Sequence, residues 1–159
     1  MYIISYIAIT IITFAIMEGV TWLTHKYIMH GFLWVLHEDH HQPKYNKVFE
    51  KNDTFFLVFA IPSIILFYYG TIPSINYFFF IGLGILLYGL AYFFVHDVFI
   101  HQRFKWFRNT RSNYLKALRR GHKVHHKYLE KHDGESFGML MVPFRFFKRH
   151  AAHIAKYCS

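Results

Sequence analysis

The sequence predicts an all-α integral membrane protein, a helical bundle with about three spanning helices. The first observation behind this prediction is a set of three long apolar stretches, and the second is the confinement of the basic residues to two other stretches. Hydrophobic residues make up 54% of the 159 residues and aromatic residues 21%, whereas soluble domains contain about 45–50% apolar residues. The length predicts one membrane-embedded domain over residues 1–159 and leaves no room for a separate catalytic module.

The three apolar stretches are residues 2–23, 54–69 and 75–95. The first corresponds to about 33 Å of helix and the third to about 32 Å, enough to cross a hydrocarbon core of about 30 Å. Pro62 is expected to kink the second helix. The first stretch lacks the basic start and the small-residue cleavage site of a signal peptide, so we interpret it as a retained membrane helix.

The 18 lysines and arginines predict the orientation of these helices. Four lie in residues 26–51 and fourteen in residues 103–156. Three crossings place both basic stretches on one side of the membrane, and the positive-inside tendency makes that side cytoplasmic, with the N-terminus outside. The net charge of +9 is therefore interpreted as a topology signal, and nucleic acid is not expected as a partner.

The polar parts of the chain are expected to be helical or interfacial. Residues 111–132 are expected to form soluble helices around a break at Gly121. Residues 31–36 and 138–147 are apolar but too short to span, so they are expected to lie at the interface. Gly82 and Gly89 lie seven residues apart on one face of the third span, where they are expected to allow close packing of helices.

Ten of the thirteen histidines form four clusters arranged as two matching halves. Each half reads HxxxxH followed by HxxHH. The ten residues are His25, His30, His37, His40 and His41 in the first half, and His96, His101, His122, His125 and His126 in the second. Neutral imidazole is the commonest nitrogen ligand of transition metals. Ten imidazoles exceed the needs of one ion, so the pattern predicts a His-rich di-metal site at the cytoplasmic helix ends, built from these ends and the soluble helices.

The spacing within the motifs bears on geometry. Positions i, i+3 and i+4 share one face of a helix, so each HxxHH is expected to present three imidazoles towards one pocket. Five residues correspond to about 140° of rotation, so the two rings of HxxxxH diverge unless the helix ends or distorts between them. A structural zinc site needs four ligands and usually includes cysteine. Ten histidines therefore favour a catalytic or redox pair of ions, with iron as the leading candidate.

Three carboxylates are candidates for orienting the imidazoles. Glu18, seven residues before His25, either accepts a hydrogen bond from a ligand imidazole or makes a polar contact between packed helices, and both interpretations stay open. Asp97 lies four residues before His101 and shares its face, and Asp39 lies inside an HxxHH motif. Carboxylates next to metal ligands orient and polarise the imidazoles.

The order of these motifs resembles the bacterial β-carotene hydroxylase family, within the fatty acid hydroxylase superfamily. The resemblance extends to HDVFIHQRF (96–104), GHKVHHK (121–127) and DGESFGML (133–140), and it covers the chain from His25 to about Phe147. It implies a non-haem di-iron monooxygenase of the bacterial inner membrane. Such an enzyme uses O2 to hydroxylate the β-ionone rings of lipid-dissolved carotenoids at carbon 3, from β-carotene towards zeaxanthin. The ten histidines named above are then the iron ligands.

This chemistry requires an external electron donor. The chain has no dinucleotide or flavin motif and no cysteine set for an iron–sulfur cluster. The basic C-terminal stretch, which includes Arg119 and Arg120, would steer an acidic soluble protein, and the resemblance suggests ferredoxin. The alternative, which we favour for most of the individual residues, is that these charges fix topology and bind anionic lipid head groups.

Two other interpretations stay open. One is a different membrane di-iron lipid oxygenase, such as a carotenoid 4-ketolase, a sterol or fatty acid hydroxylase, or a desaturase, because ligand spacing does not encode regiochemistry. The other is a non-enzymatic membrane metal-binding protein, such as a transporter or a haem-binding electron carrier. Those proteins place ligands inside their spans, whereas the spans here are almost free of histidine.

Overall fold

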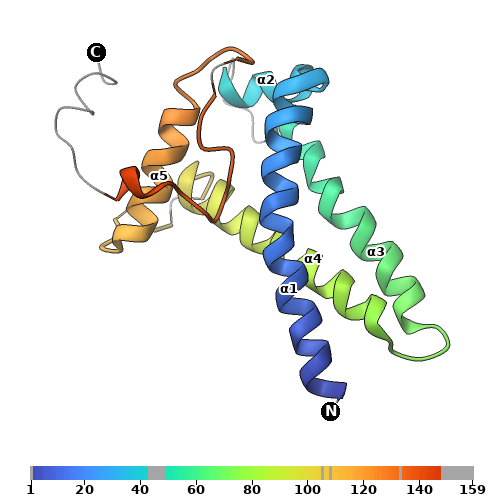
Figure 1. Cartoon of the computed structure of the whole chain (residues 1–159). Coiled ribbons are helices and arrows are strands. Elements are labelled where there is room, and N and C mark those ends of the chain that lie inside the picture. Colours follow the sequence, from blue (N-terminus) through green and yellow to red (C-terminus); the bar gives the residue numbers. More distant parts are fainter. Residues whose placement is uncertain (1, 43–48, 105, 108, 133, 148–159) are drawn as a thin grey trace.

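The computed structural model describes residues 2–42, 49–104, 106–107, 109–132 and 134–147. All regular elements in these residues are helical (Figure 1). In chain order they are α1 (Tyr2–Leu23), η1 (Thr24–Phe32), α2 (Trp34–His41), η2 (Lys51–Phe56), α3 (Leu57–Thr71), α4 (Tyr77–Phe93), η3 (Phe94–Ile100), α5 (Asn113–His125) and η4 (Phe144–Phe146). The all-α prediction is confirmed for this part of the chain.

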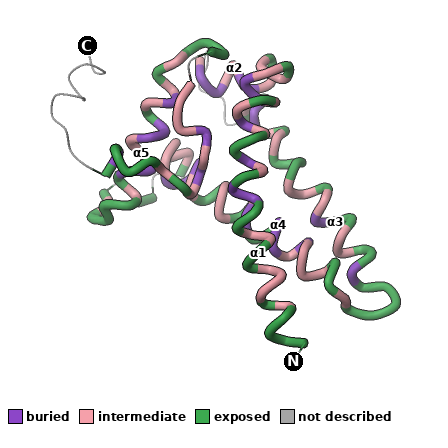
Figure 2. Tube along the Cα trace, in the orientation of Figure 1, coloured by how far each residue is buried: buried purple, intermediate pink, exposed green. Residues whose placement is uncertain are grey.

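Three helical stretches are long and apolar enough to cross a membrane: Tyr2–Phe32, Lys51–Thr71 and Tyr77–Ile100. They match the three predicted spans and extend them into the polar residues at the ends. Only 11%, 11% and 22% of their most apolar windows are buried inside the protein. Figure 2 shows the same pattern, with exposed and half-buried residues along most of α1 and α3. These helices therefore turn most of their apolar side chains outward, as helices in contact with lipid do.

Glycines allow α4 to pack closely against α3. A Cβ atom added at Gly82 would lie 3.1 Å from Leu66 Cβ, and one added at Gly89 would lie 3.0 Å from Phe59 Cβ. Both neighbours belong to α3, so the predicted close packing along this face of α4 is confirmed. Pro62 lies inside α3, which continues as one helix on both sides of it.

The predicted break at Gly121 is wrong. The helix α5 runs through this position from Asn113 to His125, and residues 126–132 after it are not helical. Residues 134–142 fold back against α5, and a Cβ at Gly121 would lie 2.8 Å from Ser136 Oγ and 2.9 Å from Val142 Cγ2. The glycine therefore provides room for a neighbouring segment and does not end the helix.

Candidate metal centre

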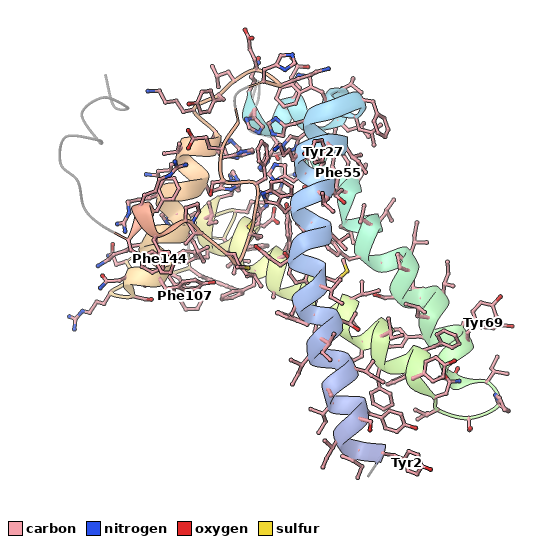
Figure 3. The ribbon with its side chains drawn as sticks, in the orientation of Figure 1. Tyr2, Tyr27, Phe55, Tyr69, Phe107 and Phe144 are labelled. Carbon is pink, nitrogen blue, oxygen red and sulfur yellow. The ribbon has the colours of Figure 1, made fainter. Side chains whose placement is uncertain are left out.

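The four histidine motifs meet at one end of the bundle, where η1, α2, η3 and α5 come together. Figure 3 shows their ring nitrogens gathered beside the upper end of α1, close to the labelled Tyr27 and Phe55. Nine of the ten predicted histidines form two groups, and within each group the potential ligand nitrogens lie within 4.8 Å of one another. The first group is His25, His30, His37, His41 and His125, and the second is His40, His101, His122 and His126.

His96 is the tenth predicted histidine and lies beside the second group. Its Nε2 atom is 3.0 Å from His40 Nε2, and its ring centroid is 4.5 Å from that of His101. The two groups are themselves adjacent, because the rings of His41 and His126 stack with centroids 4.5 Å apart. The structure therefore gathers all ten side chains into one continuous cluster.

The groups do not follow the two halves of the sequence pattern. In each HxxHH motif the first and third histidines belong to the group that contains the other histidines of the same sequence half. The middle histidine belongs to the opposite group: His40 lies in the second group and His125 in the first. The expectation of three imidazoles facing one pocket is therefore wrong. Consecutive residues of a helix point about 100° apart, so His40 and His41 diverge into two groups that face each other.

Both HxxxxH motifs lie in distorted helices. From the sequence, the two rings of each motif converge only if the helix ends or is distorted between them. Both η1 and η3 are π-helical, and hydrogen bonds of this helix join residues five apart. In η3 this bond connects the two histidines themselves, since the His101 N–H donates to the His96 carbonyl over 2.9 Å. One π-turn thus places residues i and i+5 on the same side, and the rings of His25 and His30 lie 5.3 Å apart.

In most of the rings the Nδ1 atom forms a hydrogen bond with an acceptor on the side away from the other histidines. The acceptors for His25, His30, His41 and His125 are the backbone carbonyls of Phe137, Lys131, Tyr128 and Glu135, at 2.9 to 3.1 Å. The acceptors for His37, His40 and His96 are side-chain oxygens of Asn52, Glu50 and Asp97, at 2.7, 2.7 and 3.2 Å. Carbonyl and carboxylate oxygens have no proton to give. Each of these rings therefore donates from Nδ1 and keeps its lone pair on Nε2.

The Nε2 atoms face one another. The Nε2–Nε2 distances are 3.2 Å from His25 to His37 and from His41 to His37, 3.3 Å from His30 to His125, and 3.0 Å from His40 to His96. Unprotonated nitrogens at these distances repel each other unless a cation lies between them. A neutral ring that donates one N–H to an acceptor and directs the other nitrogen inward is the usual arrangement of a metal-bound histidine. The donor set therefore fits two transition-metal ions.

Burial keeps these imidazoles in the neutral form that binds metal. It lowers the pKa of His37 and of His101 to about 2 and that of His41 to about 4. Burial, followed by repulsion from neighbouring imidazoles, lowers the pKa values of His40 and His122 well below the usual range. At neutral pH each of these rings offers a lone pair.

Glu18 does not contact an imidazole among the described residues. It is buried, and its carboxylate accepts hydrogen bonds from the Tyr88 hydroxyl at 2.5 Å and from the backbone N–H groups of residues 139–141 at 2.8 to 3.1 Å. Of the two interpretations left open, the polar contact between packed elements is the one observed. Glu18 fastens the segment whose Glu135 and Phe137 carbonyls hold two histidines of the first group.

The two other predicted carboxylates differ from each other. Asp97 accepts from His96, not from His101, because residues four apart no longer share a face in a π-helix. Among the described residues Asp39 has no hydrogen bond with an imidazole, and it accepts one from the Lys51 N–H at 2.8 Å. Two positions after His37, its side chain lies on the opposite side of α2. The expectation of an orienting role is wrong for Asp39.

Sequence reasoning missed three side chains next to the histidines. Asn52 and Glu50 hold His37 and His40. Arg103 links the carboxylates, with Nε at 3.0 Å from Asp97 and Nη2 at 3.1 Å from Glu50 and 2.7 Å from Asp53. The available signal was the polar run EKND directly before the second span, which predicts groups near the metal end of the bundle.

Comparison with known proteins agrees with this architecture. The fatty acid hydroxylase family model matches residues 10–148. The chain belongs to the fatty acid hydroxylase family. The matched range includes all ten clustered histidines and the carbonyl-bearing segment that follows α5.

Several similar proteins are named β-carotene hydroxylase, which confirms the resemblance found in the motifs. The protein from Pantoea ananas is 42% identical over 135 residues, 85% of this chain and 76% of its own length. The protein from Pseudescherichia vulneris is 42% identical over 132 residues, 83% of this chain and 74% of its own. The protein from Paracoccus sp. (strain N81106 / MBIC 01143) is 36% identical over 136 residues, 85% of this chain and 83% of its own length. No solved structure is significantly similar to the chain.

Proposed function

We propose that this protein is a carotenoid 3-hydroxylase, which adds hydroxyl groups to the β-ionone rings of β-carotene and forms zeaxanthin with O2 as co-substrate. The carrying observation is the pair of adjacent imidazole groups, in which the Nδ1 atoms of all five rings of the first group and of His40 in the second bind acceptors, so that their Nε2 lone pairs face inward. Its occurrence in a chain 42% identical to a protein named β-carotene hydroxylase supports the choice of substrate.

The ten histidines would hold two non-haem iron ions. The first group would bind one ion, and the second group, with His96 beside it, would bind the other. Bound iron supplies the oxidant that hydroxylation of a carbon–hydrogen bond requires. The acceptors at Nδ1 fix the direction of each ring and raise its basicity as a ligand. Glu50 has a further role, since its carboxylate is shared between His40 and Arg103 and ties the second group to the start of the second span.

The decisive experiment is pigment analysis of carotene-producing cells that express the chain. Hydroxylation at carbon 3 supports the proposal, whereas a 4-keto product or unchanged carotene contradicts it. His125→Ala is expected to abolish conversion while the protein stays in the membrane, because the spans do not depend on this ring. His132→Ala is the matched control, because His132 is exposed and lies outside both groups.

We further propose that the metal centre faces the cytoplasm of a bacterial cell, with the N-terminus outside the inner membrane. The supporting observation is that the histidine motifs lie within or next to the two stretches, 26–51 and 103–156, that contain all 18 lysines and arginines. A reporter fused after Ser159 is expected to read as cytoplasmic. A reporter that reads as external would overturn the orientation.

Electrons are proposed to come from an acidic carrier such as ferredoxin. Arg119 and Arg120 are unsuitable for testing its docking, because Arg119 donates to the Phe99 carbonyl and Arg120 to the Phe146 carbonyl. Arg111 and Lys123 are exposed, so their replacement by Glu probes docking without removing these contacts. Donor-limited turnover is expected to slow with rising salt and with the charge reversals. A turnover rate that changes neither with salt nor with the charge reversals would exclude electrostatic docking at this surface.

A further inference from the structure

A cavity of about 710 Å³ lies beside the histidine cluster, between the end of α4, the start of α3 and the junction of α1 with η1. Its inner end is lined by buried polar groups, including His96, Asn52 and Thr21. Its outer part is lined by apolar side chains that are exposed on the spans, including Leu90 at 56% and Phe93 at 47%. The cavity therefore leads from the lipid-facing surface to the edge of the proposed metal centre.

The position of this cavity fits a substrate that arrives from the bilayer. Phe55, which is labelled in Figure 3 at the histidine end of the bundle, lines the cavity and packs edge-on against His37 with ring centroids 6.3 Å apart. On the same side, Tyr92 stacks on His96 at 5.1 Å. Aromatic walls of this kind suit a flat, unsaturated hydrocarbon.

Thr21 is a polar side chain without a partner at the inner end. It is 6% exposed, and its Oγ1 atom has no hydrogen-bond partner among the described residues. The Tyr88 hydroxyl lies close enough to interact with Thr21, but it donates its own hydrogen bond to Glu18. Thr21 lies in the last turn of α1, four residues before His25 at the start of η1. A buried hydroxyl without a partner carries a desolvation cost, which a polar atom on a bound molecule would remove.

We propose that this cavity takes up one end ring of a linear carotenoid directly from the bilayer, and that the Thr21 hydroxyl binds the ring oxygen of the hydroxylated product. The proposal rests on the proposed carotenoid hydroxylase function. A volume of about 710 Å³ is that of a pocket for one drug-sized ligand. It accommodates an end ring and adjoining chain carbons, while the remaining polyene extends into lipid. The two rings of one carotenoid are therefore hydroxylated in separate binding events, and the singly hydroxylated molecule leaves the cavity between them.

Filling the cavity tests where the substrate binds. Ala60 lines the cavity on α3, and Ala60→Phe is expected to weaken β-carotene binding about tenfold, because overfilling a binding site is destabilising. The control is Ala15→Phe, the same change at an exposed position of α1 outside the cavity. Binding is measured as β-carotene retained by the iron-loaded protein in lipid nanodiscs without O2 or reductant, so the readout is independent of turnover.

Removing the Thr21 hydroxyl tests the polar contact. Thr21→Val is expected to leave β-carotene binding unchanged and to weaken binding of the doubly hydroxylated carotenoid, which presents a ring oxygen at either end, about fivefold, the usual effect of one hydrogen bond. The control is Thr13→Val, the same substitution at a position of α1 outside the cavity. It is expected to change the binding of neither ligand. Equal binding of both ligands by Thr21→Val and the native protein would overturn the role of Thr21.

The outcomes separate this proposal from the function on which it rests. Native protein that hydroxylates carotene, together with an Ala60→Phe variant that binds as the native protein does, overturns the cavity assignment and leaves the function standing. Native protein that produces no hydroxylated carotenoid overturns both. If Ala60→Phe loses its iron, Leu90→Trp at the exposed rim carries the same test. Native-like binding by that variant counts against the cavity.

Discussion

Asn52→Leu is expected to loosen one of the two metal ions and to leave the other in place. The Asn52 side chain accepts a hydrogen bond of 2.7 Å from His37 Nδ1. His37 is 1% exposed and Asn52 is 7% exposed, so water does not replace the lost acceptor. Leucine fills a similar volume but leaves the N–H group of the His37 ring buried and unpaired.

The magnitude follows from this geometry. A buried donor without a partner costs about 1–3 kcal/mol, which corresponds to a factor of about 5–150 in an equilibrium constant. Removing the partner of a ligand imidazole lowers metal affinity about 10–100-fold in characterised sites. The two ranges overlap, so we expect affinity at the first group to fall by about one to two orders of magnitude.

The assay is metal retained per chain during titration with a chelator, because Asn52 also lines the cavity and activity alone would mix the two effects. One ion is expected to leave at a lower chelator concentration than the other. Asn52→Asp keeps an acceptor and is expected to restore retention. Asn113→Leu, at an exposed position of α5, is the control. Native-like retention of both ions by Asn52→Leu, or release of both together, would refute the reasoning.

Three other predictions follow from the contacts of the cluster. His40→Ala is expected to lose the ion of the second group and His125→Ala that of the first, so each variant keeps about one ion per chain; loss of the opposite ion in metal-competition spectra would contradict the crossed arrangement. Acid is expected to destabilise the metal-free protein: burial lowers the pKa of His41 to about 4, so between about pH 6.5 and 4 the unfolded chain binds a proton that the folded chain does not. Each such imidazole then removes up to about 1.4 kcal/mol of stability per pH unit as the pH falls, and a melting temperature that stays constant from pH 7 to 5 would be evidence against this. Glu18→Ala is expected to cost about 1–3 kcal/mol of unfolding free energy and to expose residues 139–141, measured by amide hydrogen exchange, whereas Glu18→Gln keeps an acceptor and recovers most of the protection; unchanged exchange in Glu18→Ala would refute the fastening role.

Local sequence determined the elements of this fold. Uninterrupted apolar stretches long enough to cross a bilayer specify three spans, since a helix is the structure that satisfies its own backbone in lipid. Spacing at i, i+3 and i+4 placed the HxxHH motifs on the short helix α2 and on α5. The number of clustered histidines, ten, indicated two metal ions. The order of the motifs indicated the protein family without any knowledge of the geometry.

The tertiary structure decided which ring belongs to which group. His40 and His125 cross between the halves because two helices face each other, and a spacing rule describes only one helix at a time. The acceptors behind His25 and His41 lie 112 and 87 residues away in the chain, and a backbone carbonyl can be supplied by any residue type. The role of Glu18 stayed undecided for the same reason, because its partners are the backbone of residues 139–141. Interactions within one helix depend on residue spacing, which the sequence contains, whereas contacts between distant segments depend on how the whole chain packs.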